Sequence, residues 1–514
     1  MTAALESTTT QTAQALAAQA QAAQAQAAKT HKYRWYTLAV LCLSLLVIVV
    51  DGTIVNVALP TFARDLHAGT TGLQWIVDAY TLTYAALLLL SGALADRYGR
   101  HHALTAGLVT FGAGSLLAAF TQTTTELIAT RVLMGIGAAL IMPATLSVLS
   151  TVFTNPAERV KAIGLWSAVS GLGVAIGPVA GGYLLAHFSW GSIFVVNLPI
   201  VAIALVAGHW LIPASRAPRN GKLDVSGALL SVAAFTALTY AIIEAPVNGW
   251  LSGTTMGLFA AAALLLAGFG IREARAGHPV LPLRIFRDRQ FTGAAITLTV
   301  LFFGLTGTVF LSTQIYQFVL GYSPLAAGLR ALPSAAALVV FSPLGALISK
   351  RAGVLVPVVL GLVMLAGGLV FFSTATAASG YGHYVIAMVT ISAGIGLAMS
   401  AVTSASMGRL PREMAGVGSA VNDTTRNMGS VLGVAVFGSI AASAFASTMR
   451  AAGTHAATSI GAATEIAKHA GGAQGASLLH TAASAFVTGA DRAVIAGVVA
   501  ALAGAIIAAR TLRR

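Results

Sequence analysis

Four charged side chains lie inside long apolar runs of the sequence: Asp51, Asp78, Arg131 and Asp423. A charge at the centre of a bilayer costs about 2.5–3.5 kcal/mol on insertion scales, so such residues usually face a partner or a water-filled cavity. Burial raises the pKa of a carboxyl group, whereas a nearby arginine lowers it. An aspartate held between these two influences can bind and release a proton as its access to water changes.

The first three of these charges are expected at similar depth. Counting about 1.5 Å per helical residue from the ends of their apolar runs places Asp51 ~12 Å, Asp78 ~9 Å and Arg131 ~8 Å from the same face. Arg131 can therefore pair with either aspartate, and the sequence leaves that choice open. We expect Asp51 and Arg131 to carry proton coupling, with a purely structural ion pair as the alternative.

The surroundings of Asp78 suit a bound cation. Gln74, Asp78 and Thr81 recur at helical spacing and share one face. Cation–π attraction is worth about 0.5–2 kcal/mol, although aromatic residues are also common near membrane interfaces. The nearby aromatic residues are Trp75, Tyr80 and Tyr84. For Asp423, a role in substrate binding stands beside a local ion pair with Arg426, three residues on.

A glycine-rich run marks the fifth apolar segment. Gly173, Gly177 and Gly181 recur every four residues on one helix face, which lets another helix approach closely. Pro178 removes a backbone hydrogen bond and is expected to kink the helix. A smooth, kinked helix suits a surface where two helical bundles rock against each other, and simple close packing is the plainer alternative.

The elements that must position these residues are membrane-spanning helices. Of the 514 residues, 57% are hydrophobic and only 9% are charged, against about 25% in soluble domains. This composition indicates an all-α polytopic membrane protein and excludes most soluble enzymes and nucleic-acid binders. Fourteen candidate spans lie near 37–58, 72–94, 103–121, 126–150, 161–186, 192–212, 225–244, 253–271, 291–318, 326–348, 354–374, 384–407, 416–446 and 492–509.

The loop charges orient these spans. Lys and Arg collect in cytoplasmic loops, and here they occupy every second gap between the apolar runs. They are Arg97, Arg100, Arg159, Lys161, Arg216, Arg219, Lys222, Arg272, Arg275, Arg284, Arg287, Arg289, Lys350, Arg351, Arg409 and Arg412, joined at the C-terminus by Arg510, Arg513 and Arg514. We therefore expect a multi-pass protein of the cytoplasmic membrane with both termini cytoplasmic. The net charge of +14 then reflects contact with membrane lipids, not with nucleic acid.

The sequence contains no set of residues for catalysis or metal binding. It has no phosphate-binding Gly-x-x-x-x-Gly-Lys loop, no Gly-x-Ser-x-Gly and no His-Glu-x-x-His. Its single cysteine, Cys42, cannot form an internal disulfide. We expect no enzymatic activity, no metal site and no cofactor other than protons as the coupling ion.

Four motifs together resemble those of a known family. Residues 50–60 (VDGTIVNVALP), 92–100 (GALADRYGR), 131–137 (RVLMGIG) and 177–182 (GPVAGG) are similar, in order and position, to motifs of the major facilitator superfamily. The chain resembles its fourteen-span drug:proton antiporters of the QacA/EmrB type. The resemblance implies motif roles in conformational change for Gly92, Asp96, Arg97, Gly99, Arg100, Gly173, Gly177, Pro178, Gly181 and Gly182.

The resemblance also implies an architecture. Two six-helix bundles are expected to flank two additional spans, which makes the fold a major facilitator fold with about fourteen spans. The expected parts are a low-complexity cytoplasmic tail (1–34), which composition suggests is mobile, a first bundle (35–212), two extra spans with a flanking loop (213–275), a second bundle with an extracytoplasmic loop at 447–491 (276–509) and a short cytoplasmic C-terminus (510–514).

The function implied is efflux of amphipathic, cationic drugs or toxic compounds in exchange for protons, by alternating access. In the quaternary-ammonium exporters, acids at the positions of Asp78 and Asp423 recognise cations. Asn427 stands where that group has a second acid, so a preference for divalent cations is not implied. A dedicated exporter of one self-made antibiotic or lipid-like metabolite and a proton-coupled importer remain as alternatives.

Overall fold

The computed structural model describes residues 2–212, 224–276, 283–407, 415–454 and 459–512. Within these ranges the backbone forms helices and connecting turns, without any strand. The expected all-α class is confirmed. A helix satisfies its own backbone hydrogen bonds, which lipid cannot do for it.

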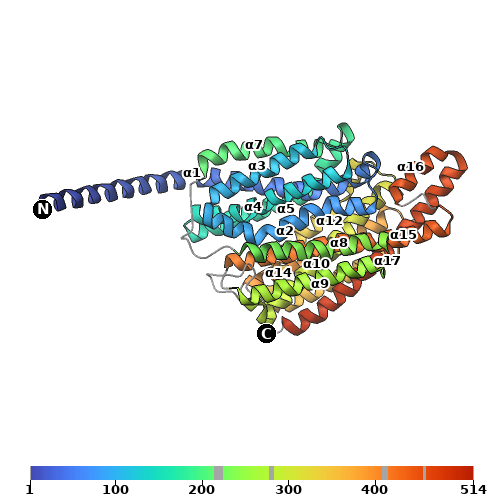
Figure 1. Ribbon diagram of the computed structural model, residues 1–514. Coiled ribbons are helices and arrows are strands. Elements are labelled where there is room, and N and C mark those ends of the chain that lie inside the picture. Colours follow the sequence, from blue (N-terminus) through green and yellow to red (C-terminus); the bar gives the residue numbers. More distant parts are fainter. Residues whose placement is uncertain (1, 213–223, 277–282, 408–414, 455–458, 513–514) are drawn as a thin grey trace.

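The first part of the chain contains α1 (Thr2–Asp65), α2 (Thr70–Tyr98), α3 (Arg100–Ala118), α4 (Thr124–Val152), α5 (Pro156–His187), α6 (Ser192–Val195) and α7 (Asn197–Leu211). A capping box starts α4, because Thr123 and Glu126 satisfy each other's backbone N–H groups. The Ala/Gln-rich segment 2–31, which belongs to the expected tail, forms the first part of α1 and projects from the rest of the chain (Figure 1). Alanine and glutamine both favour helix.

The second part contains α8 (Val225–Asn248), α9 (Gly253–Arg275), the 3₁₀ helix η1 (Leu283–Arg287), α10 (Arg289–Gln314), the π-helix η2 (Ile315–Val319), α11 (Pro324–Arg330), α12 (Leu332–Ala352), α13 (Leu355–Phe372), α14 (Tyr381–Met407), α15 (Ala415–Ala451), α16 (Ile460–Ala470) and α17 (Gly472–Thr511). Short polar side chains cap several of these helices at their N-termini, among them Asp224, Ser252 and Asp288. The described residues of 447–491 are mostly helical.

Twelve helical segments in the described part of the chain are long and apolar enough to cross a membrane. The expected count of fourteen spans is therefore not confirmed. The two expected spans outside this set, 72–94 and 103–121, are helical as α2 and α3. For α3, the polar residues at positions 100–102 lower its mean hydropathy. For α2, the side chains at positions 89, 93 and 96 lie outside the described residues.

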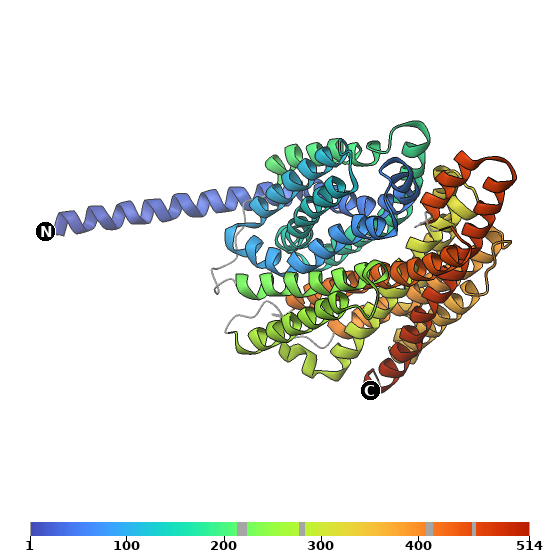
Figure 2. The ribbon, with the colours of Figure 1, turned by 45° about the vertical axis from the view of Figure 1, so that its right-hand side comes forward.

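The helices pack in two groups. We use "first bundle" for α1–α7 and "second bundle" for α10–α17, including η2. The hairpin of α8 and α9 lies between them (Figures 1 and 2), and α8 packs against both α2 and α15. Ile242 of α8 packs with Ala435 of α15 and Trp75 of α2, and its carbonyl accepts the hydroxyl of Ser439 of α15 at 2.8 Å. The hairpin therefore covers the seam between α2 and α15.

The two bundles are joined near the end of the molecule that carries α16. Gln317 of η2 donates its Nε2 to the carbonyl of Val57 of α1 at 2.8 Å. A Cβ added at Gly182 of α5 would lie 2.6 Å from the Cα of Leu325 of α11. One at Gly461 of α16 would lie 2.9 Å from Ala63 of α1. In this conformation the bundles are in close contact at this end.

Basic residues gather at the opposite end. Arg34, at the start of the first apolar run, pairs with Glu158 of α5 at 2.9 Å, and the ammonium of Lys161 lies 5.5 Å from the ring centroid of Trp35. These contacts place the basic segment at 158–161 beside residues 34 and 35 of α1. The basic residues Arg216, Arg219, Lys222, Arg409, Arg412, Arg513 and Arg514 lie outside the described residues.

Candidate functional site

Asp51 of α1 and Arg131 of α4 form a buried ion pair. The Nη1 of Arg131 donates to Oδ2 of Asp51 at 2.5 Å, and the two side chains are only 1% and 0% exposed. The structure thus resolves the choice that the sequence left open, because Asp51 and not Asp78 is the partner of Arg131. If either partner of such a buried pair is removed or neutralised, the remaining charge is left uncompensated, which strongly destabilises this arrangement.

Two neutral side chains extend the hydrogen-bond network of this pair. Asn197 of α7 donates its Nδ2 to Oδ1 of Asp51 at 3.1 Å and to Oγ of Ser115 of α3 at 3.0 Å. The hydroxyl of Ser115 donates in turn to the carbonyl of Phe194 at 2.9 Å. Asn197 and Ser115 were not among the predicted site residues, because a neutral polar side chain is far less conspicuous in an apolar run than a charged one. An isolated amide within the apolar run 193–208 was the signal that could have revealed Asn197.

Arg131 is also held by α2. Its Nε donates to the carbonyl of Ile76 at 3.1 Å, and its guanidinium carbon lies 4.2 Å from the ring centroid of Tyr80. The hydroxyl of Tyr80 donates to the carbonyl of Ile48 of α1. Backbone, aromatic and carboxylate groups from two helices, α1 and α2, therefore fix the guanidinium plane, a geometry that lysine cannot reproduce.

Asp78 of α2 is fully buried, and neither of its oxygens has a hydrogen-bond partner among the described residues. On the same helix face, Gln74 donates its Nε2 to the carbonyl of Ala435 at 2.8 Å and to Oγ of Ser439 at 3.2 Å, both on α15. Asp78 thus lies on the side of α2 that faces the second bundle. An isolated buried carboxylate is costly when ionised, so this position favours an added proton or cation.

The three aromatic residues expected around Asp78 have different surroundings. Tyr80 stacks with Tyr84 at a centroid distance of 6.3 Å while its other contacts go to Arg131. The ring of Trp75 lies 6.0 Å from that of Tyr240 of α8. Trp75 and Tyr84 thus have neighbours on α8 and α15, whereas Tyr80 lies within the first bundle, so the three rings do not form one closed cage.

A second polar group joins α2 to α15. The side chain of Tyr84 lies close to Asp423, Arg426 and Asn427 of α15. Arg426 donates to Oδ1 of Asp423 at 3.2 Å, so the local ion pair weighed from the sequence is formed. Its guanidinium carbon lies 4.9 Å from the ring centroid of Phe302. Tyr84 and Asp423, two residues expected to bind substrate, are therefore brought together from opposite bundles.

The motif at 92–100 joins the turn after α2 to α4. Gly99 has a φ of 109°, which a side chain would strain. Arg100 donates to the carbonyl of Ser147 at 3.3 Å and to the hydroxyl of Thr151. Arg97 is exposed, and a Cβ at Gly92 would meet Pro143 at 3.8 Å. The side chain of Asp96 lies outside the described residues.

The glycine face of α5 packs closely on α1. An added Cβ at Gly173 would lie 2.9 Å from Val49, one at Gly181 would lie 2.6 Å from Ile54, and one at Gly177 would collide with Oγ1 of Thr53. The expected close packing is confirmed. The far side of α5 meets the second bundle, where the carbonyl of Pro178 lies against Gly328 of α11.

Comparison with known proteins places this geometry in context. The family model described as Major Facilitator Superfamily matches residues 41–434. The chain is similar to the multidrug efflux pump LfrA of Mycolicibacterium smegmatis, at 35% identity over 92% of this chain and 95% of the relative. It is also 34% identical to the tetracenomycin C resistance and export protein of Streptomyces glaucescens, over 80% of this chain and 76% of that protein.

The fold also matches a solved structure. A bacterial homologue of the human lysosomal transporter Spinster, in an inward-facing and occupied conformation, aligns with a TM-score of 0.66. The alignment covers 93% of this chain and 97% of that one, at 18% sequence identity. At this identity the likeness concerns the fold alone.

Proposed function

Because the chain belongs to the major facilitator superfamily, we propose that it is a proton-coupled antiporter that exports amphipathic drugs across the cytoplasmic membrane. Relatives named for multidrug efflux and for antibiotic export support the direction and the class of substrate. The observation that carries the coupling proposal is the buried pair of Asp51 and Arg131 with Asn197 on its second oxygen. The proposal requires no cofactor besides the transported proton.

The coupling step follows from electrostatics. Protonation of Asp51 removes the charge that compensates Arg131, and an unpaired buried charge costs about 3–5 kcal/mol. The protein then favours another arrangement, in which water or a different partner satisfies the guanidinium. Loss of the proton to the cytoplasm restores the pair. Drug release on the outer side is linked to the protonated state and drug loading on the inner side to the ionised state.

Arg131→Lys is expected to lower proton-driven efflux at least about tenfold, although it keeps the positive charge. Lysine loses the planar set of donors that reaches Asp51 and the carbonyl of Ile76 together. Efflux of a fluorescent dye, measured in energised cells at matched protein levels, tests this. Arg64→Lys, at a partly exposed arginine that donates to Thr61, is the matched control. Equal efflux in both variants would show that the geometry at Arg131 is unimportant.

For substrate binding we propose the surface of α2 that faces the second bundle. Asp78 has no partner among the described residues, whereas Asp423 is already paired with Arg426. Asp78 therefore attracts a cationic drug more strongly than Asp423 does. Trp75, Tyr80 and Tyr84 supply aromatic surface along the same seam.

Asp78→Asn is expected to reduce efflux of a lipophilic cation such as ethidium at least about tenfold and to spare a neutral drug. The reason is that the amide keeps the shape of the side chain but cannot balance a positive charge. Efflux of both compounds is measured in the same cells, with Glu465→Gln, an exposed carboxylate paired with Lys468, as the control. Equal losses for both drugs would instead assign Asp78 a structural role.

The proposed topology has fourteen spans, counting α2 and α3 with the twelve segments described above, and places both termini in the cytoplasm. Residues 35–212 form the first six-helix bundle, 213–275 the two additional spans and 276–509 the second bundle. The end that carries α16 then faces outside. Since the bundles are in close contact at that end, this conformation is closed to the outside.

The deciding experiment is a drug-susceptibility panel in a host that lacks its own efflux pumps, with and without an uncoupler. Resistance to several unrelated cationic compounds that disappears with the uncoupler is the expected result. Resistance to one compound only would favour the dedicated exporter. Proton-driven uptake into proteoliposomes in the substrate-importing direction would favour the importer, and no uncoupler-sensitive transport at all would refute the proposal.

A further inference from the structure

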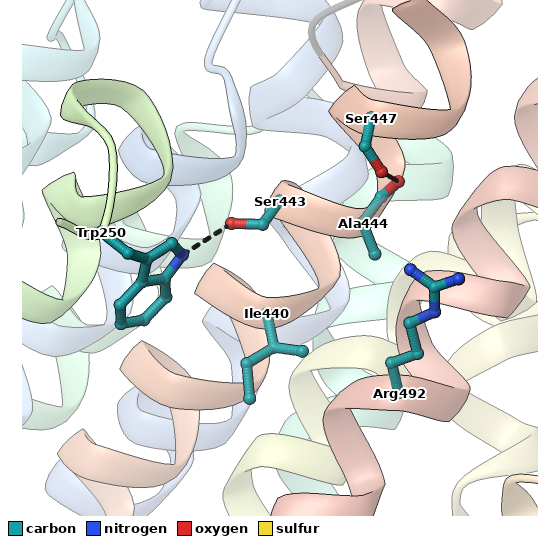
Figure 3. Close-up of a pocket in the computed structure, with 6 residues that line it drawn as sticks. All are labelled: Trp250, Ile440, Ser443, Ala444, Ser447 and Arg492. Atoms are coloured by element: carbon teal, nitrogen blue, oxygen red, sulfur yellow. Dashed lines mark hydrogen bonds between the residues drawn. The ribbon is translucent and has the colours of Figure 1, made fainter. Parts of the chain in front are cut away.

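A surface cavity of about 320 Å³ lies at the tip of the α8–α9 hairpin, away from Asp51 and Asp78. It is lined by Trp250, Ile440, Ser443, Ala444, Ser447 and Arg492 (Figure 3). These residues come from the hairpin turn, from α15 and from α17. Trp250 and Arg492 stand on opposite sides of α15, so the cavity joins three elements that are distant in the sequence.

The charge of this cavity is positive. Arg492 is exposed, and no carboxylate in the described part of the chain lies within ion-pair distance of it. None of the six lining residues is acidic. A guanidinium with free donors favours an oxyanion, above all a phosphate, which it can contact through two parallel hydrogen bonds.

Hydroxyl groups lie beside this cation. Ser443 Oγ accepts the indole N–H of Trp250 at 3.1 Å, which leaves its own proton available as a donor. Ser447 now donates to the carbonyl of Ala444 at 2.8 Å, and its oxygen is free to accept. The site thus offers neutral hydrogen-bonding groups for a polar headgroup next to the cation.

Exposed apolar side chains lie near Trp250 in the sequence. Val247, three residues before Trp250, and Leu251, directly after it, are 70% and 89% exposed, which suits contact with lipid better than contact with water. Tryptophan is enriched where a membrane meets water, because its ring is apolar and its N–H is polar. An occupant with both an anionic head and an apolar tail matches this combination better than a free anion does.

We propose that this cavity binds the phosphate headgroup of an anionic phospholipid, with Arg492 as the cation, Ser443 as a hydroxyl donor and Trp250 at the level of the glycerol backbone. On the topology proposed above, the lipid belongs to the outer leaflet. It contacts the hairpin turn, α15 and α17 together, so it fastens the hairpin to the second bundle.

The test is lipid binding by the purified full-length protein, which does not depend on transport. The protein in nonionic detergent is titrated with fluorescent phosphatidylglycerol and, separately, with phosphatidylcholine carrying the same acyl chains. We expect phosphatidylglycerol to bind roughly tenfold more tightly, as a charge-assisted contact predicts. Arg492→Gln should remove this preference, and Arg492→Lys should keep part of it.

Arg450→Gln is the matched control, because Arg450 is an exposed arginine in the last turn of α15 that does not line the cavity. Equal lipid preference in Arg492→Gln and Arg450→Gln would overturn the proposal. Inorganic phosphate serves as a competitor. If it displaces the lipid fully at millimolar concentration, the site is an anion site without selectivity for lipid, and the proposal fails. A failure of drug export would leave these binding results unaffected.

Discussion

Asp51→Asn is expected to abolish proton-driven efflux while the protein reaches the membrane at normal levels. The amide can still hydrogen-bond, but it cannot ionise, and Arg131 loses the only carboxylate with which it pairs in the described part of the chain. Leaving a buried charge uncompensated costs about 3–5 kcal/mol. At about 1.4 kcal/mol per factor of ten, this shifts the conformational equilibrium roughly 100- to 4,000-fold.

The measurement is uncoupler-sensitive dye efflux at matched expression, accompanied by proton release from proteoliposomes on addition of drug. Glu158→Gln makes the same kind of chemical change, from carboxylate to amide, at a partly exposed residue paired with Arg34, where water screens the two charges more than it does at the buried pair. That control should transport normally. Undiminished efflux in Asp51→Asn would remove Asp51 from the coupling mechanism.

Gly177→Leu is expected to eliminate transport by separating α5 from α1. Even a Cβ at this position would collide with Thr53 and lie 3.1 Å from the carbonyl of Val50. Overpacking a tight interface usually costs about 1–3 kcal/mol, and here the facing atoms include backbone, which cannot rotate away. The thermal stability of the purified protein should fall together with its transport rate.

Gly164→Leu provides the control on the same helix, because an added Cβ there has no neighbour within 4 Å. The same residue is introduced into the same helix, so any general effect of leucine on α5 appears in both variants. Transport at the normal rate in Gly177→Leu would show that α5 and α1 can separate without loss of function.

The sequence identified the charged members of the coupling site because charge is rare and costly in an apolar run. It could not select between Asp51 and Asp78 as the partner of Arg131. Counting residues gives the depth of each side chain along its helix, but which helix lies next to Arg131 depends on how the helices pack. Asn197 and Ser115 were missed because neutral polar residues in membrane helices carry little signal until a partner is seen.

Twelve of the fourteen spans expected from hydropathy match helical segments able to cross a membrane, but the helix ends were not predictable. The run predicted at 492–509 belongs to α17, which begins at Gly472, and the run predicted at 37–58 belongs to α1, which begins at Thr2. Hydropathy reports where the chain can enter lipid. Alanine-rich segments continue as helix beyond that limit, because their backbone preference does not depend on the membrane.

The contacts that attach the α8–α9 hairpin indicate which helix surfaces would slide past each other if the two bundles rock, as proposed above. Two hydrogen bonds fix it to α15, from Ser439 to the carbonyl of Ile242 and from Trp250 to Ser443. Its described contacts with α2, such as that of Trp75 with Tyr240, are apolar and aromatic. Contacts of this kind are individually weak and not directional, so α2 can move along α8 by exchanging one set for another. If the protein works by the alternating access proposed above, we expect the hairpin to move with the second bundle, so that the sliding surface is the one between α8 and α2.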